Sequence, residues 1–201
     1  MKKQITFLIL FFSTLLFLNA AWAIDPDKQK VANLNKGVFL IASKQLDYTS
    51  MRKTVIYLVQ HDEAGSSGII INHPTNLKIN EAFPDTKASD YSNKTLFFGG
   101  PLHTQYLFML TQTKFTRGLF EINQGVYFGT GDQIKVRLQA EKTPDTIRTF
   151  AGFMSWGPEQ LEQEIMDGTW ILSPAAPEEV FSKDSTKLWE KLFKRWSGSW
   201  T

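Results

Sequence analysis

Three histidines are the side chains of this sequence best suited to exchanging a proton near neutral pH. No two of His61, His73 and His103 stand one helical turn apart, as a helical zinc motif requires. His61 is followed directly by Asp62, and a base beside an orienting acid could serve general acid–base catalysis. Neighbouring residues on a strand point to opposite faces, so we prefer a turn-stabilising role for the two side chains. The sequence thus predicts no metal site and no catalytic residue.

A second candidate is the sequence Gly99-Gly100-Pro101, which follows an aromatic run. Consecutive glycines expose backbone N–H groups without side-chain obstruction, so this turn could form an anion nest or an oxyanion-type site. No Lys or Ser follows as in a phosphate-binding P-loop, and no helix start is evident. We therefore prefer a tight turn that lets two segments of sheet approach each other.

Polar residues also gather where a helix is expected to begin. Gln160 and Glu164 would share one face of that helix, because residues four apart are neighbours, and Trp156 precedes it. The group could grip a ligand or hydrogen-bond the sheet, and we prefer the second. No serine lies in a Gly-x-Ser-x-Gly nucleophile elbow. Including Asn72, the candidate ligand-binding residues are His61, Asp62, Asn72, Gly99, Gly100, Trp156, Gln160 and Glu164.

Strands that could position these residues are predicted by hydrophobic patterning. Near-continuous apolar and β-branched runs at 38–42, 55–59 and 68–72 indicate strands buried on both faces. Shorter runs at 96–98, 106–110 and 126–128 indicate further strands. The polar segment 61–67 suits a hairpin, residues 123–125 suit a turn, and 84–94 suits a mobile surface loop.

Three helices are expected in the C-terminal half. Thr143-Pro144-Asp145 has an N-cap, a proline at the first helical position and an acid in the first turn. A second helix begins after Gly157, ends at Gly168 and is flanked by Trp156 and Trp170, which we expect to be buried. The terminal helix carries an apolar stripe of Leu188, Trp189, Leu192, Phe193 and Trp196. Its excess of lysines allows weak contact with a membrane surface, but we prefer docking through the stripe.

The first 23 residues have the three parts of a secretory signal peptide. A basic start at Lys2-Lys3 precedes an apolar run to Leu18 and the small-x-small sequence Ala21-Trp22-Ala23. The run is short for a membrane span, so we expect cleavage and a periplasmic protein. The mature chain would then comprise an N-terminal extension at 24–36 and one domain at 37–201.

The composition of the chain excludes several classes of protein and of functional site. Hydrophobic residues make up 42% of the 201-residue chain and aromatic residues 13%, which fits one folded α/β domain rather than a disordered protein. The absence of cysteine excludes disulfides, thiolate zinc sites and cysteine nucleophiles. The 22 Lys and Arg include Lys2 and Lys3, so the mature chain would carry 20 basic and 20 acidic residues. Without a net positive field we expect no nucleic-acid partner, and no motif calls for a cofactor.

Several motifs together resemble the YqgE/AlgH family. They are, in chain order, Gly37-Val38-Phe39-Leu40-Ile41-Ala42, Thr54-Val55-Ile56-Tyr57-Leu58, His61-Asp62, Gly68-Ile69-Ile70-Ile71-Asn72, Phe98-Gly99-Gly100-Pro101, Phe153-Met154-Ser155-Trp156, Gln160-Leu161-Glu162-Gln163-Glu164-Ile165 and Gly168-Thr169-Trp170. The resemblance implies a single compact α/β (α+β-like) domain, with a coiled, partly barrel-like sheet flanked by helices. It implies no catalytic residues, and the family is described as transcriptional regulators or as uncharacterised. The signal peptide departs from the family, as does Asp47-Tyr48-Thr49-Ser50, where the family tends to have an acid–proline–phenylalanine turn.

Three functions from different classes follow. The preferred one is a non-enzymatic binding or accessory protein of the bacterial envelope, with a small ligand or a protein as its partner. A transcriptional regulator would need access to DNA, a basic surface and a helix-turn-helix or basic-region pattern, none of which the sequence favours. A hydrolase-like enzyme using His61 or the Gly99-Gly100 turn would need a paired nucleophile and base, which the sequence does not reveal.

Overall fold

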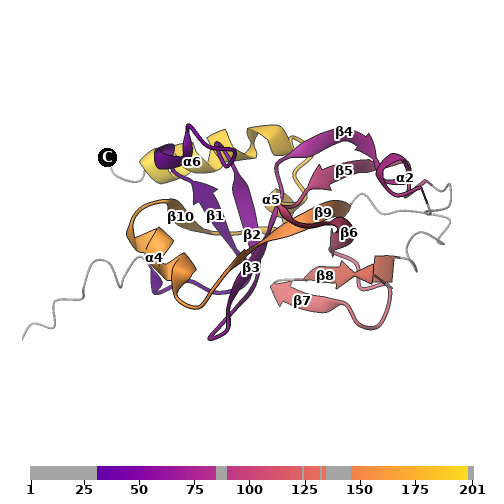
Figure 1. The fold of residues 1–201 in the computed structure, drawn as a ribbon, viewed down its shortest axis with the longest axis horizontal. Helices are drawn as coiled ribbons and strands as arrows, with labels where there is room; N and C mark the ends of the chain where they lie inside the picture. The colour runs from indigo at the N-terminus through magenta and orange to yellow at the C-terminus, as the bar shows by residue number, and fades with distance from the viewer. Residues whose placement is uncertain (1–30, 85–89, 124, 132, 135–145, 199–201) are drawn as a thin grey trace, which may run out of the picture.

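The computed structural model describes residues 31–84, 90–123, 125–131, 133–134 and 146–198 (Figure 1). Its strands are β1 (Val38–Ala42), β2 (Val55–Asp62), β3 (Gly65–Ile70), β4 (Pro74–Lys78), β5 (Thr95–Phe98), β6 (Leu102–Thr111), β7 (Phe120–Asn123), β8 (Val126–Thr130), β9 (Ile147–Trp156) and β10 (Trp170–Pro174). Its α-helices are α2 (Ile79–Ala82), α4 (Gln160–Met166), α5 (Pro177–Val180) and α6 (Leu188–Gly198), with 3-10 turns η1 (Lys44–Leu46) and η2 (Ser185–Lys187).

One large sheet joins all of these strands, and β9 is its hub. The main path runs β10-β1-β2-β3-β9-β6-β8-β7, while β5 pairs with β9 and β4 pairs with β5. The β5–β9 pairing is parallel, and the other pairings within the described residues are antiparallel. In Figure 1, β9 crosses between the half that holds β1–β3 and the half that holds β4–β8. The expected single domain with a large sheet flanked by helices is confirmed, and because β10 and β7 at the two ends of the described path do not pair, the sheet is not closed into a barrel.

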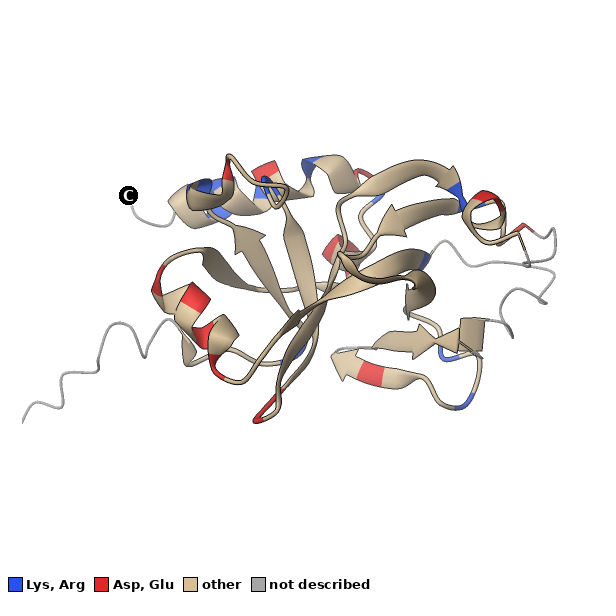
Figure 2. Ribbon diagram, in the orientation of Figure 1, with Lys and Arg blue, Asp and Glu red and all other residues tan. Residues whose placement is uncertain are grey.

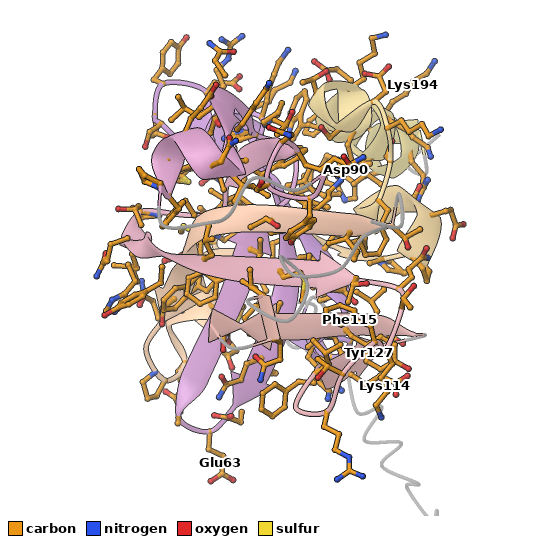
Figure 3. All side chains as sticks on the ribbon, turned by 90° about the vertical axis from the view of Figure 1, so that its right-hand side faces the viewer. Glu63, Asp90, Lys114, Phe115, Tyr127 and Lys194 are labelled. Atoms are coloured by element: carbon orange, nitrogen blue, oxygen red, sulfur yellow. The ribbon has the colours of Figure 1, made fainter. Side chains whose placement is uncertain are left out.

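The buried strands and the first hairpin confirm the sequence patterning. Phe39 to Ala42 and Val55 to Leu58 are almost wholly buried, because sheet neighbours and helices cover both faces. The β2–β3 hairpin turns at Glu63 and Ala64 with Asp62 opposite Gly65. Figure 3 shows Glu63 at this tip and Lys194 of α6 at the opposite end of the molecule. The β7–β8 turn is also confirmed at Gly125, which has φ +78°.

Two of the expected helices are present, and both dock on the sheet. Helix α4 ends at Met166, and Gly168 just beyond it has a φ of +76° that is accessible to glycine. Trp156 and Trp170, which flank it, are buried as expected. In α6, Leu188, Trp189 and Leu192 are buried, and the Trp189 indole donates to the Ala42 carbonyl of β1 at 2.9 Å. The terminal helix therefore docks through its apolar stripe, while Trp196 stays 38% exposed.

The third expected helix is wrong. Thr143-Pro144-Asp145 lies outside the described residues, and strand β9 begins immediately afterwards at Ile147. β9 pairs with β6 at residues 147–151 and 153, with β5 at 149–151 and with β3 at 154–156. Its β-branched and aromatic residues suit such a strand, so long-range pairing overrides the local capping signal.

The segment expected to be a mobile surface loop is only partly one. Residues 85–89 lie outside the description, but Tyr91 and Ser92 are fully buried. The Tyr91 hydroxyl hydrogen-bonds the Thr149 hydroxyl of β9, and its ring packs in a second hydrophobic cluster with Leu96 and Met109. The polar composition of this segment concealed one anchoring aromatic residue.

None of the helices in the described part of the chain has the length and apolar character needed to span a membrane.

Candidate functional site

His61 lies between a hydroxyl and a carboxylate at the hairpin end of the sheet. Its position opposite Ser66 in the β2–β3 register puts Nδ1 2.9 Å from Ser66 Oγ. Pairing of β3 with β9 brings the hairpin beside α4, where Glu162 Oε1 lies 3.8 Å from His61 Nε2. Serine, histidine and glutamate are the components of a nucleophilic triad. Ser66 is 5% exposed, however, so a substrate carbonyl could not approach it readily, and the arrangement favours a structural brace.

Asp62 takes no part in that group. Its carboxylate accepts from Gln60 Nε2 at 2.7 Å and from the Ala64 backbone N–H at 2.9 Å. The hydrogen bond from the Gln60 side chain, followed by the one from Ala64, lowers the pKa of the exposed Asp62 carboxyl. His61 and Asp62 thus have different partners, as strand geometry predicts, and Asp62 holds the hairpin turn.

Trp156, Gln160 and Glu164 come together, but they satisfy one another. Glu164 Oε2 accepts the indole N–H of Trp156 at 2.9 Å and that of Trp170 at 2.7 Å. Glu164 Oε1 accepts from Gln160 Nε2 at 2.9 Å, and Gln160 Oε1 accepts the Gly157 backbone N–H at 3.1 Å. The two indole rings meet edge to face with centroids 6.3 Å apart. This cluster ties α4 to β9 and β10, and the sequence did not indicate that Trp170 shares it.

Asn72 is occupied by backbone groups. Its Oδ1 accepts the Val55 N–H at 2.8 Å, and its Nδ2 donates to the Lys53 carbonyl at 2.8 Å. Asn72 lies just past the end of β3, where regular pairing stops. Its side chain therefore stabilises the start of β2. Because both ends of the amide are bonded and Asn72 is 5% exposed, it offers little to a ligand.

The Gly99-Gly100 turn allows backbones to cross closely. The Gly99 N–H donates to the Ala151 carbonyl at 2.8 Å, and the Gly99 carbonyl accepts the Ile70 N–H at 2.9 Å. A Cβ at Gly100, where φ is +153°, would lie 2.2 Å from the Phe153 carbonyl carbon. Glycine is needed because β9 passes against this turn, and the Gly99 N–H is unavailable to an anion. The geometry agrees with a tight crossing rather than an anion nest.

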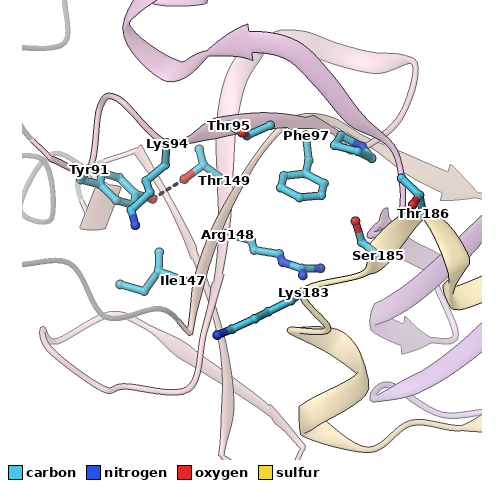
Figure 4. Close-up of a pocket in the computed structure, with 11 residues that line it drawn as sticks. Tyr91, Lys94, Thr95, Phe97, Ile147, Arg148, Thr149, Lys183, Ser185 and Thr186 are labelled. Carbon is cyan, nitrogen blue, oxygen red and sulfur yellow. Dashed lines mark hydrogen bonds between the residues drawn. The ribbon is translucent and has the colours of Figure 1, made fainter.

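A cavity of about 340 Å³ lies between β5, the start of β9 and the segment leading into α6 (Figure 4). It brings together four parts of the chain that are distant in sequence. The residues that line it are Pro74, Tyr91, Lys94, Thr95, Phe97, Ile147, Arg148, Thr149, Lys183, Ser185 and Thr186. Its wall thus combines cationic, hydroxyl and apolar side chains, and none of these lining residues is acidic.

Arg148 is the central charged residue of the cavity. Its Nη1 donates to the carbonyls of Val180 at 3.0 Å and Ile71 at 3.4 Å, and its Nη2 donates to the Ser182 carbonyl. The guanidinium carbon lies 5.0 Å from the centroid of the Phe97 ring. Burial lowers the pKa of Arg148 to about 10, so it remains charged at neutral pH.

This cation has no carboxylate partner among the residues that the structure describes. The hydrogen bonds to Ile71, Val180 and Ser182 use three of its five N–H groups, which leaves Nε–H and one Nη2–H without a partner in the described part of the chain. These donors could meet an acceptor that enters the cavity. Sequence reasoning missed Arg148 because it assigned this stretch to a helix, and a lone arginine between Ile147 and Thr149 was the available signal.

Metal binding has no support in the described residues, which contain no group of three or more His, Cys, Asp or Glu side chains placed to hold an ion. His73 is partly buried with Nε2 3.3 Å from the Thr54 hydroxyl. Burial lowers the pKa of this histidine, which favours a neutral ring in a structural hydrogen bond.

Comparison with known proteins finds similar proteins in bacteria. A family model described as AlgH-like (DUF179) matches residues 39–201. A UPF0301 protein of Chlamydia caviae is 32% identical over 171 residues, which are 84% of this chain and 90% of the relative. A UPF0301 protein of Bacteroides thetaiotaomicron is 31% identical over 178 residues, which are 86% of this chain and 90% of the relative.

Two solved structures have a similar fold. The solution structure of the AlgH protein from Pseudomonas aeruginosa has a TM-score of 0.67 and 26% identity, covering 80% of this chain and 87% of that protein. A crystal structure of a Corynebacterium diphtheriae protein has a TM-score of 0.64, covering 84% of this chain and 93% of its own. At 21% identity the second supports the fold alone.

Proposed function

This chain belongs to the AlgH-like family, and on that premise we propose that it is a non-enzymatic binding protein of the bacterial envelope that holds a small ligand beside Arg148. The observation that carries the proposal is the cavity of about 340 Å³ beside a half-buried cation. Small-molecule sites are concave, mixed in polarity and built around a few fixed polar groups. Arg148 is such a group, because three backbone carbonyls and the Phe97 ring hold it in place.

Binding is favoured over catalysis because the reactive side chains already have structural partners. His61 hydrogen-bonds the buried Ser66, and Glu164 accepts two indole N–H groups and an amide. Among the described residues that line the cavity there is no histidine and no carboxylate that could act as a base. A hydrolase would need a nucleophile and a base that both reach one substrate, and the lining residues do not include such a pair.

An envelope location is supported by the first 23 residues. The basic start at Lys2-Lys3, the apolar run and the sequence Ala21-Trp22-Ala23 are typical of an exported protein. Osmotic-shock fractionation followed by N-terminal mass spectrometry tests this part of the proposal. We expect periplasmic protein that begins at Ile24, and cytosolic protein that retains residues 1–23 would contradict it.

A regulator role is disfavoured by the charge distribution. Figure 2 shows Lys and Arg mixed with Asp and Glu over the described chain rather than gathered on one face. Lys191 and Arg195 of α6 both contact the buried carboxylate of Glu179, which lies in α5. A membrane surface would meet mainly Lys187, Lys194 and the partly exposed Trp196, so we propose no more than weak contact there.

Binding is tested with the purified mature protein and a panel of small molecules of different charge. Thermal denaturation and heteronuclear NMR spectra would be recorded for each compound. We expect saturable shifts confined to the resonances of Phe97, Arg148 and the 183–186 segment. If no compound shifts these resonances while others bind elsewhere, the cavity is not the binding site and the proposal fails.

A further inference from the structure

We infer that the ligand of the Arg148 cavity is a small organic molecule that carries a phosphate group, an inference that rests on the proposed binding function. It concerns the same cavity and states which chemical class of ligand the lining residues favour. Three cations, five residues with hydroxyl groups and several apolar side chains line this space, and each kind of group favours a different part of the ligand.

The charges in the wall select an anion. Lys94, Arg148 and Lys183 all line the cavity, with no acidic residue among the lining side chains. Asp184, next to Lys183 in sequence, is directed to Lys187 instead, with Nζ to Oδ2 at 3.0 Å. Arg148 is half-buried and has no carboxylate partner among the described residues, so it loses hydration that carbonyl dipoles replace only in part. An anion in the cavity would restore that loss.

The hydrogen-bond donors select phosphate rather than carboxylate. Thr95 and Ser185 add hydroxyl groups to the ammonium groups of the two lysines and to the N–H groups of Arg148 that have no partner among the described residues, while the Thr186 hydroxyl donates to Asp184 Oδ1 at 3.4 Å. A carboxylate presents two oxygens in one plane, whereas a phosphate monoester presents three acceptor oxygens in a tetrahedral array and nearly two charges. Figure 4 shows Arg148 directed toward Lys183 and Ser185, on the side where Thr186 also lies. Donors that approach from several directions match the tetrahedral group better.

The apolar wall selects the rest of the ligand. Pro74, Tyr91, Phe97 and Ile147 line the same space. Its volume of about 340 Å³ equals that of roughly eleven water molecules at about 30 Å³ each, far more than one phosphate ion fills. An organic group of the size of an aromatic ring would fill the remainder against Phe97 and Ile147.

Four probes of graded chemistry test the inference by isothermal titration calorimetry at low salt. The probes are phenyl phosphate, inorganic phosphate, benzoate and benzyl alcohol. Phenyl phosphate should bind with 1:1 stoichiometry and at least tenfold more tightly than inorganic phosphate, because ring burial adds about 1.4 kcal/mol or more. Benzoate should bind at least fivefold more weakly than phenyl phosphate, and benzyl alcohol more weakly still.

Variants at the rim separate charge recognition from folding. Lys183→Met should weaken phenyl phosphate binding by about five- to tenfold, as expected for one hydrogen bond to a charged group. Lys194→Met is the matched control, since it removes the same charge from an exposed position of α6 that does not line the cavity. It should change the affinity by less than about twofold, in keeping with the small worth of exposed charges. Arg148→Lys keeps the charge and removes the guanidinium fork, and it should weaken binding if its unfolding transition matches the wild type.

The outcomes distinguish the inference from the function on which it rests. Benzoate binding equal to phenyl phosphate would overturn the phosphate assignment. Benzyl alcohol binding as tightly as phenyl phosphate, with no effect of Lys183→Met, would overturn anion recognition and leave the binding function standing. No binding by any of the four probes, together with no binding in the wider panel, would overturn both.

Discussion

Replacing Glu164 with alanine should reduce the free energy of unfolding by about 3–5 kcal/mol, although the residue lies on a surface helix. One carboxylate oxygen accepts the indole N–H groups of Trp156 at 2.9 Å and Trp170 at 2.7 Å, and the other accepts the Gln160 amide at 2.9 Å. Both tryptophans are less than 5% exposed, so alanine would leave two buried donors without an acceptor. Each such donor costs about 1–3 kcal/mol, and loss of the exposed Gln160 bond adds a smaller amount.

Two further variants isolate the cause. Glu164→Gln keeps a carbonyl oxygen for the indoles but loses the charge that strengthens both bonds, so it should cost about 1–2 kcal/mol. Gln163→Ala is the control on the same helix, because its amide is exposed and bonds only the neighbouring Asp167 among the described residues. It should stay within about 0.5 kcal/mol of the wild type.

Urea unfolding followed by far-ultraviolet circular dichroism is the appropriate assay, because tryptophan fluorescence would respond to the substitutions directly. The slope of unfolding free energy against urea should be the same in all variants, so that midpoints report stability. Glu164→Ala within 1 kcal/mol of Gln163→Ala would refute the reasoning, since the indoles would then have found water or another acceptor.

Three other measurements test the structure: the stability of one glycine variant, the acid dependence of one carboxylate variant and the affinity for DNA. Gly152→Ala should cost about 3 kcal/mol or more, because its Cβ would lie 2.2 Å from the Gly100 carbonyl oxygen at a residue with φ +75°; a urea midpoint equal to the wild type would contradict this. Burial alone would raise the pKa of Glu179, but hydrogen bonds from Arg195 and Lys191 outweigh it and hold the pKa below its usual value. The stability from this carboxylate is therefore present above the pKa of the unfolded chain and is lost as pH falls through the lower folded pKa, so melting temperatures of Glu179→Gln should fall less steeply with acid than those of the wild type. Duplex DNA should bind the mature protein no more tightly than about 10⁻⁴ M at physiological salt in fluorescence anisotropy, and submicromolar binding that survives competitor DNA would restore the regulator reading.

Local chemistry in the sequence was enough to predict a large part of this fold. The apolar runs of β1 and β2 are long enough to require burial on both faces wherever they pair. Glycines end α4 and shape the β7–β8 turn through conformations that depend on the residue itself. The stripe of α6 is likewise a property of helical spacing, and it needed only a sheet on which to dock. Family motifs spread over most of the chain agreed with the same α/β domain.

The tertiary structure alone decided what the functional groups do. The segment after Asp145 became β9 because three other strands supply its hydrogen bonds, and no local signal encodes partners so distant. Arg148 depends on carbonyls at 71, 180 and 182, and its cavity is enclosed by segments around 91–97, 147–149 and 183–186. Glu164, by contrast, accepts a second indole N–H from Trp170, so its carboxylate stabilises the packing of α4 against the sheet. Spacing along the chain determines which face a residue occupies, but only packing between distant segments determines which donors are satisfied and which remain for a ligand.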